Sequence, residues 1–396
     1  MIAHDYARSI VTNIAYGTGP YLRVTDLAIA VNDEMERRGI PRMRIIVPWV
    51  YADKQVRVMR EEFSSHEEQY PGEIVLDPEL GRLLKIVFYA DSSYREALEQ
   101  WVGRVKEVSS RAHAHLESSF SGIDLSGRTH RIEGKNIAME LSRSPRVRYD
   151  VGPAYFTSFA YIAEILEHAR GVREIAVPFD LLEQGIVVAN WVEAAQKVRC
   201  LAYPATFSYR ADSDHVPRYA GEIMVPPIAP PPSEHHDSIA PGIFVTVTGI
   251  PGLERLYQDA RRLGLCIYSN DTDAVPGSIL ASPHIIPNKN ILFQFARAGW
   301  SSVWLSMISG TPLVVPHFDP EDDPEIYFNN TSVDALQLGL IYRGEPLEEL
   351  LERRHIVQES CGRMKQEIMR RWGTLDGNKY SARLFVDDFF ATSSTL

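Results

Sequence analysis

The sequence predicts a two-domain α/β protein, for two reasons. The chain has 396 residues, and one domain usually holds about 100–200. A strand–loop–helix–strand pattern opens the chain and returns after a proline-rich segment in its second half. Parallel strands joined by helical crossovers form Rossmann-like domains, whose binding loops lie at the carboxyl ends of the strands. We therefore expect two Rossmann-like domains that face each other across a cleft.

The first strand–helix–strand unit occupies residues 9–47. Residues 9–15 are an apolar run that predicts a buried strand, and residues 43–47 predict the next one. Between them, Gly39 is placed to end a helix. The apolar face of that helix shows in side chains at helical spacing: Val24, Leu27, Ala28, Val31 and Met35.

The same pattern begins again after the proline-rich segment. Residues 243–248 predict a strand, residues 249–252 a loop, and a helix begins at Leu253. Residues 265–268 then predict the second strand of the unit. This order of elements predicts that a second Rossmann-like domain starts here.

Further elements follow from apolar spacing and stop signals. Residues 301–309 predict a short helix that Gly310 ends, and residues 312–315 predict a buried strand. Residues 155–168 carry aromatic and aliphatic side chains at helical spacing, which predicts a core helix. Residues 381–390 are apolar enough to form a terminal helix that docks on one of the two domains.

Proline density marks the domain boundary. Prolines restrict backbone rotation and remove hydrogen-bond donors, so a proline-rich stretch interrupts regular structure. We therefore assign residues 1–225 to an N-terminal acceptor domain, residues 226–241 to a linker, and residues 242–396 to a C-terminal donor domain whose last helix can return to the first. The linker prolines are Pro226, Pro227, Pro230, Pro231, Pro232 and Pro241.

Charge disfavours nucleic acid as a partner. The chain has 41 Lys and Arg against 52 Asp and Glu, a formal net charge of −11, which opposes non-specific attraction to phosphate backbones. One basic stretch departs from this balance and predicts either a solvated face or a contact with an anionic acceptor or lipid headgroup. Its members are Arg128, His130, Arg131, Lys135, Arg143, Arg146 and Arg148.

Cysteine usage and the N-terminus predict a cytoplasmic protein, with attachment to a membrane surface left open. The three cysteines are widely spaced and form no CxxC pattern, so neither a disulfide framework nor a zinc site is expected. Polar residues precede any apolar run at the N-terminus, which is not typical of a signal peptide. No apolar stretch reaches the roughly 18 residues that a membrane span needs.

Two glycine-containing loops are candidate binding sites. In the first, Gly17, Thr18 and Gly19 join a strand to a helix, where a tight turn can bring helix N-terminal amides near an anionic ligand. The spacing matches neither GxGxxG nor a P-loop, so a merely tight turn stays an alternative. Gly249 lies in the corresponding loop of the second half.

The second loop, before the helix predicted at residues 301–309, indicates a diphosphate site more strongly. Gly299 permits close approach of the backbone, and Ser301 and Ser302 add hydroxyls at the helix N-terminus. Arg297 can add a bidentate contact to phosphate oxygens, or form a surface salt bridge instead.

These loops resemble motifs of inverting glycosyltransferases of the GT-B architecture. The peptidoglycan-precursor N-acetylglucosaminyltransferase has GTGGH in the first loop, where this chain has Gly17-Thr18-Gly19-Pro20-Tyr21. Residues 297–302, RAGWSS, are similar to RSGA of that enzyme and to HCGWNS of small-molecule glycosyltransferases. Residues 310–316, GTPLVVP, are similar to a GxPxxxxP strand, and residues 325–329, EIYFN, lie where the family has an acidic or amide pair followed by Asn.

The resemblance covers residues 15–47 and 243–330 and implies a transferase of hexosyl or N-acetylhexosaminyl groups. It implies a nucleoside-diphosphate sugar as donor, an inverting and metal-independent reaction, no further cofactor, and an acceptor that is a small molecule, glycan or lipid. Donor contacts are implied for Arg297, Gly299 and Trp300, and for Glu325 and Asn329 near the sugar.

Three departures from the family pattern bear on the chemistry. Tyr21 replaces the first-loop histidine that serves as base, and Leu305 stands where the donor helix carries a ribose-binding glutamate. Residues 287–297 are also shorter than usual, which affects the pocket for the donor base.

An inverting transfer needs a group that accepts the proton of the acceptor hydroxyl. Tyr21 and Asp26 are the candidates near the first loop. A phenol titrates near pH 10 and needs strong positive potential to ionise at neutral pH, which Arg23 and the helix N-terminus could supply in part. We expect Tyr21 to orient the acceptor or the sugar while another carboxylate or histidine takes the proton.

Two other functions fit the same residues. A sugar-nucleotide 2-epimerase binds similar donors between two Rossmann-like domains, and a catalytically degenerate binding protein would explain Tyr21 and Leu305. An acidic loop at residues 319–325 is predicted to be solvated rather than to bind a metal, since no further ligand accompanies it.

Overall fold

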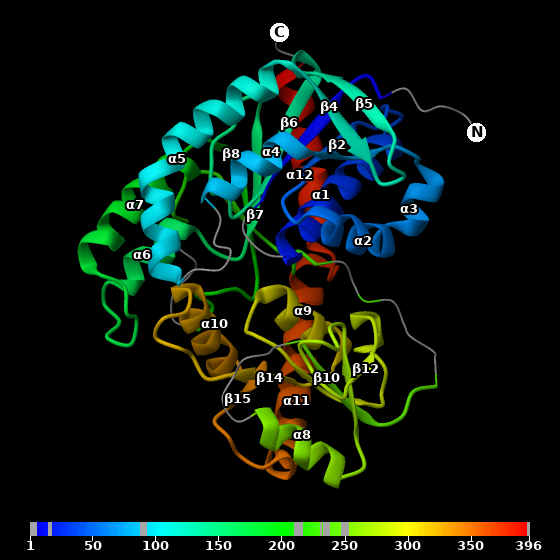
Figure 1. Cartoon of the computed structure of the whole chain (residues 1–396), viewed down its shortest axis with the longest axis vertical. Helices are drawn as coiled ribbons and strands as arrows, with labels where there is room; N and C mark the ends of the chain where they lie inside the picture. The colour runs from blue at the N-terminus through cyan, green and yellow to red at the C-terminus, as the bar shows by residue number, and fades with distance from the viewer. Residues whose placement is uncertain are drawn as a thin grey trace. The chain divides into compact units, whose positions relative to one another are not determined.

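The computed structural model describes residues 6–14, 18–87, 93–209, 217–229, 232, 238–246 and 253–393. The chain packs as two compact units, each built on one sheet (Figure 1). Unit 1 comprises Met1–Ala202, Pro217–Ile228 and Asn378–Leu396, and unit 2 comprises Tyr203–Val216 and Ala229–Gly377.

The sheet of unit 1 has the strand order β5-β4-β3-β2-β1-β6-β7-β8-β9 among the described residues. All neighbours are parallel except β3–β4 and β4–β5, so a hairpin extends one edge. Because β1 lies between β2 and β6, the strand order reverses at β1. The strands are β1 (Ser9–Ile14), β2 (Arg44–Pro48), β3 (Ile74–Asp77), β4 (Ser119–Asp124), β5 (Thr129–Glu133), β6 (Ile137–Arg143), β7 (Ala154–Ser158), β8 (Gln196–Ala202) and β9 (Glu222–Val225).

Most helices of this unit pack through buried apolar side chains, whereas α3 has no buried residue. Helix α1 packs on β1, β2 and β6, and α7 packs against both α5 and α6 (Figure 1). Helix α12 packs on unit 1, where Phe385 contacts the Tyr155 ring at a centroid distance of 5.0 Å. The helices are α1 (Thr18–Arg37), α2 (Ala52–Glu62), α3 (Ser64–Gln69), α4 (Pro78–Leu84), α5 (Tyr94–Glu117), α6 (Ile162–Ala169), α7 (Phe179–Glu193) and α12 (Gly377–Ser393), with short 3-10 turns η1 (Lys85–Val87) and η2 (Gly134–Asn136).

The sheet of unit 2 is wholly parallel, with the order β12-β11-β10-β13-β14-β15 in the described part of the chain. Here the order reverses between β10 and β13. The strands are β10 (Gly242–Val245), β11 (Cys266–Ser269), β12 (Ile279–Leu280), β13 (Ile291–Phe295), β14 (Leu313–Pro316) and β15 (Gly339–Tyr342). The helices are α8 (Leu253–Arg262), η3 (Pro283–Ile285), α9 (Trp300–Ser309), α10 (Pro324–Ala335) and α11 (Leu347–Trp372).

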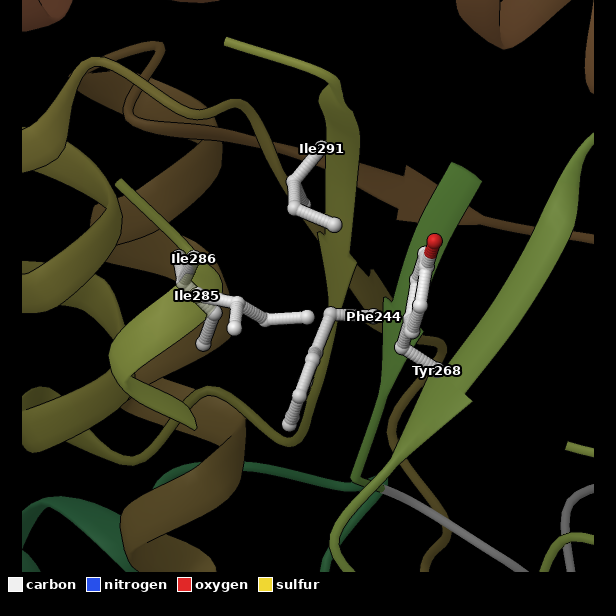
Figure 2. Packing of buried hydrophobic residues seen from close by; sticks show 5 residues of the cluster. All are labelled: Phe244, Tyr268, Ile285, Ile286 and Ile291. Atoms are coloured by element: carbon white, nitrogen blue, oxygen red, sulfur yellow. The ribbon is translucent and has the colours of Figure 1, made fainter. Parts of the chain in front are cut away.

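One side of this sheet carries an apolar cluster drawn in Figure 2. Phe244, Tyr268 and Ile291 come from three neighbouring strands, and Ile285 and Ile286 come from η3 and the residue after it. All five side chains are buried. The cluster therefore fixes η3 against three strands, of which β13 leads to the loop before α9.

The predicted α/β fold class is confirmed, and most predicted elements lie within one to three residues of the observed ones. Gly39, with φ of 75°, follows the end of α1, and Gly310, with φ of 76°, ends α9. The helix predicted for residues 155–168 is wrong in its first half, where Ala154–Ser158 is β7 and only Ile162–Ala169 is helical. Aromatic and β-branched side chains favour a strand there, and pairing with β6 and β8 decides it.

The observed units differ from the predicted boundary at two places. Residues 203–209 were assigned to the first domain, yet they pack in unit 2, where Trp304 Nε1 donates to the Pro204 carbonyl at 2.9 Å. The first residues of the predicted linker belong to unit 1, where Ile228 is buried and its carbonyl accepts from Arg143 at 3.1 Å. Most of the remaining linker lies outside the described residues.

No helix within the described ranges is long and apolar enough to cross a membrane.

Candidate functional site

The loop between β13 and α9 lies at the carboxyl end of a strand beside the point where the strand order reverses. Ligands of open α/β sheets bind at this kind of position, because the loops on either side of the reversal diverge and leave a crevice. Residues 296–299 form this loop, and β10, on the other side of the reversal, leads toward the segment that contains Gly249. Gly249 itself lies outside the described residues, as does Gly17.

The N-terminal end of α9 is open to a ligand. Gly299 is the N-cap residue and supplies no side chain to the helix amides. In the described part of the chain, no hydrogen bond engages the amides of Trp300 and Ser301. A Cβ built at Gly299 would meet no atom within 4 Å. Two amides without a partner among the described residues and the positive end of the helix dipole therefore lie next to a residue with free space at its Cβ position, which is a setting that binds phosphate.

Ser301 and Ser302 lie in the first turn of α9 and are partly exposed. Their hydroxyls make no hydrogen bond within the described residues and can reach a ligand bound at the helix end. Arg297 is 56% exposed and pairs with Asp322 at 2.8 Å. Burial raises the pKa of the Asp322 carboxyl, and Arg297 opposes that shift. Of the two interpretations of Arg297, the salt bridge is the one observed.

Three residues predicted to contact the donor form one hydrogen-bonded chain. Asn329 Nδ2 donates to Glu325 Oε1 at 3.0 Å. Trp300 Nε1 donates to Asn329 Oδ1 at 2.8 Å and to Thr206 Oγ1 at 3.0 Å. Glu325 is partly exposed at the start of α10, whereas Trp300 and Asn329 are 1% and 0% exposed. The structure thus brings these residues together, with only Glu325 accessible to a ligand.

Leu305 packs where the family pattern has a ribose-binding glutamate. Its side chain lies against the apolar cluster of Figure 2. The neighbouring Ser306 is fully buried and donates to Gln294 Oε1 at 2.6 Å. This position of α9 therefore contributes to the core, and a ribose contact there would need a different group.

The corresponding position in unit 1 follows β1, where the strand order also reverses. Helix α1 begins at Thr18, although the side chain of Thr18 lies outside the described part. A Cβ at Gly19 would meet nothing within 4 Å. The start of α1 thus has space around its backbone, as at α9.

The two predicted catalytic residues are placed less favourably. Tyr21 is only 1% exposed, and its ring lies 5.8 Å from that of Tyr51. Asp26 pairs with Arg23 at 2.6 Å, and Arg23 also contacts Glu62 at 2.9 Å.

Two consequences follow from this arrangement. The positive potential expected from Arg23 is neutralised by two carboxylates, so it cannot help Tyr21 to ionise. Asp26 is held in an ion pair, which disfavours it as a base, because a carboxylate stabilised by a cation binds a proton more weakly.

A buried acid that was not predicted from the sequence lies beside β1. Glu140 of β6 is 2% exposed, and its Oε1 accepts from Asn13 Nδ2 of β1 at 2.7 Å. Burial raises the pKa of Glu140 to about 7. Asn13 and Glu140 could have been noticed in the sequence as polar residues inside apolar strands. Thr206 gave no such signal, because it lies outside the predicted donor domain.

The basic stretch does not form one face. Arg143 is 4% exposed and bonds to a backbone carbonyl, whereas Arg131 is 76% exposed at the side chain and pairs with Glu133. His130 pairs with Asp124 at 2.7 Å. Spacing in the sequence therefore did not translate into a shared surface for an anionic ligand.

No protein-family model matches the sequence, and no curated protein matches it. Solved structures do match. A UDP-glucosyltransferase from Polygonum tinctorium capable of glucosylating indoxyl has a TM-score of 0.60 at 11% identity, over 98% of this chain and 99% of its own. The structure of LpCGTa in complex with UDP has a TM-score of 0.57 at 14% identity, over 97% of this chain and 99% of its own.

The glycosyltransferase SsfS6 of Streptomyces sp. SF2575 has a TM-score of 0.52 at 12% identity, over 96% of this chain and 99% of that one. At such identities the similarity concerns the fold, and it extends over nearly the whole of each chain. Together with the two sheets, one wholly parallel and one mostly parallel, it shows that this protein has the GT-B fold and resembles the glycosyltransferases built on it.

Proposed function

We propose that this protein is a glycosyltransferase that moves a sugar from a nucleoside-diphosphate sugar to an acceptor hydroxyl. The observation that carries the proposal is the open N-terminal end of α9, where two amides without partners in the described residues and two hydroxyls surround Gly299. The site lies at the strand-order reversal of a GT-B fold, and one protein with this fold was solved in complex with UDP. Fold alone does not assign the activity, so the proposal rests on the site.

The reaction would be a single displacement. The acceptor oxygen bonds to the anomeric carbon as the bond from that carbon to the diphosphate breaks, and attack from the opposite face inverts the configuration. Negative charge grows on the leaving diphosphate, where helix amides and serine hydroxyls stabilise it. We therefore propose a reaction that does not require a metal ion.

Glu325 is the residue we assign to the sugar, because its carboxylate lies at the exposed end of α10 and can accept hydrogen bonds from hydroxyls. The side chains of Trp300 and Asn329 bond to each other inside unit 2 and act from behind the donor, while the backbone amide of Trp300 belongs to the diphosphate site. The acceptor proton goes to a group of unit 1, a carboxylate or histidine other than Asp26, with Tyr21 helping to orient the acceptor or the sugar. We propose that the acceptor is a small molecule, a glycan or a lipid.

The diphosphate site is tested by Gly299→Val. Gly299 has φ of −69° and free space at the Cβ position, so valine fits the fold but fills the space that phosphate would take. We expect affinity for UDP or GDP, measured by calorimetry, to fall about 100-fold, as for the loss of two or three hydrogen bonds to a charged group. Gly362→Val in α11, which also meets no atom within 4 Å, is the matched control. Unchanged affinity in Gly299→Val would remove this site.

The activity is tested by mixing the protein with UDP-, GDP- and CMP-sugars and following free nucleotide and sugar configuration. Release of nucleotide with transfer to an acceptor supports the transferase. Exchange of the C2 hydrogen would instead show an epimerase, and binding without turnover would show a degenerate binding protein.

A further inference from the structure

Asn329 occupies an unusual position for a polar side chain. It lies on α10 one turn after Glu325, is fully buried, and uses both ends of its amide within unit 2. Its Nδ2 donates to Glu325 Oε1 at 3.0 Å, and its Oδ1 accepts from Trp300 Nε1 at 2.8 Å. A buried amide that is satisfied at both ends holds its neighbours in one arrangement, because breaking either bond leaves a polar group unpaired.

The chemistry of the two neighbours requires a group between them that both accepts and donates, as an amide does. An indole N–H only donates, and an ionised carboxylate only accepts, so the residue that joins them must accept on one side and donate on the other. The indole and the carboxylate also fix which way the amide points. Asp in place of Asn keeps the acceptor for Trp300 but loses the donor, and places a second negative charge beside Glu325.

The two neighbours belong to the two ends of the site. Trp300 is the first residue of α9, directly after Gly299, and Glu325 lies in the first turn of α10. Asn329 therefore links the helix end that holds the diphosphate to the carboxylate assigned to the sugar. Thr206 also accepts from the Trp300 indole, at 3.0 Å. Thr206 and Asn329 therefore share the single indole N–H.

We propose that Asn329 is a positioning residue that holds the Glu325 carboxylate in register with the N-terminal end of α9, and so sets the preference for a sugar nucleotide over the free nucleotide. The inference rests on the proposed function, since it assigns a role to Glu325 in sugar binding. It assigns no contact between Asn329 and the donor.

The test compares Asn329→Asp with the wild type in calorimetric titrations of a UDP-sugar and of UDP alone. We expect affinity for the UDP-sugar to fall about 10-fold while affinity for UDP changes less than about 2-fold, because only Glu325 moves. A general loosening of α9 and α10 would weaken both ligands alike and would overturn the positioning role. If Asn329→Asp does not fold, Trp300→Phe serves instead, because it removes the indole donor that orients the amide. It should lower the ratio of the affinity for the UDP-sugar to the affinity for UDP by about 3-fold.

Two further variants make the inference decisive. Thr206→Val removes the other partner of the indole and should lower the melting temperature while leaving the ratio unchanged. In a Glu325→Gln background, Asn329→Asp should add less than about a 2-fold change in the ratio, because residues that act in series are not additive.

A wild type that binds no sugar nucleotide would refute the proposed function and this role with it. A wild-type preference that Asn329→Asp leaves intact would refute the positioning role alone.

Discussion

Glu140→Gln should raise the free energy of unfolding at neutral and alkaline pH and leave it nearly unchanged at acidic pH. Glu140 lies in β6, next to the central strand β1, and is 2% exposed, and its bond with Asn13 involves a neutral amide. Burial, the largest cause, raises the pKa of Glu140 from 4.5 to about 7, and Asn13 lowers it only in part. A glutamine side chain has the same shape and can accept the same bond without a charge.

The sign follows from proton binding. Between the unfolded pKa of 4.5 and the folded pKa of about 7, the folded state holds the proton while the unfolded state releases it. As the pH rises through this window, the free energy of unfolding of the wild type therefore falls by about 1.4 kcal/mol per pH unit, and it is constant above the window. The whole shift in the pKa of Glu140 corresponds to a loss of about 3 kcal/mol in the free energy of unfolding. The Glu140→Gln variant has no carboxyl group at this position and does not show that loss.

The assay is urea unfolding of the wild type and Glu140→Gln at intervals from pH 4 to pH 8.5. The difference in free energy of unfolding should be near zero at the acidic end, rise through the window and reach about 2–3 kcal/mol above pH 7. Glu68→Gln, at an exposed position, is the control and should show no such rise. A difference that does not vary with pH, or a variant less stable than the wild type at pH 8, would refute the reasoning.

Two predictions concern turnover. Tyr21→Phe should reduce turnover by about 10-fold at most, as expected for the loss of one hydrogen bond to a polar substrate group. Tyr51→Phe, which changes the neighbouring ring, is the control. Complete loss of transfer with intact donor binding would instead show that Tyr21 is the base. Excess chelator should leave turnover within about 2-fold of its starting value, because amides and hydroxyls at α9 are proposed to carry the charge of the leaving group. Loss of activity that Mg²⁺ or Mn²⁺ restores would show that the reaction requires a metal.

Local signals in the sequence were sufficient for the fold class and for the helix end at Gly299. Apolar spacing and stop signals are properties of neighbouring residues, so the strand–helix order and the glycines that end α1 and α9 could be predicted without tertiary contacts. The helix predicted at residues 155–158 is wrong because neighbouring residues alone do not determine the structure there. The aromatic run there fits either a helix or a strand, and pairing with β6 and β8 decides between them.

Roles of side chains depended on contacts between distant residues. Arg23, Asp26 and Glu62 form a cluster that joins two helices, and it removes the potential that Tyr21 would need. Thr206 and Trp300 meet across 94 positions of the sequence, and Asn13 and Glu140 across 127. Spacing along the chain carries no information about such pairs.

By itself, the sequence determined that the protein has two α/β halves, where their main turns lie, and that a helix at Gly299 is suited to an anion. Each of these depends on the conformational preferences of a few consecutive residues. Only the tertiary structure decided that residues 203–209 pack in unit 2, that Asn329 and Trp300 are buried and bonded to each other, and that Leu305 packs against the apolar cluster. Burial and hydrogen-bond partners are set by which segments meet, and for these residues the partners come from distant parts of the chain.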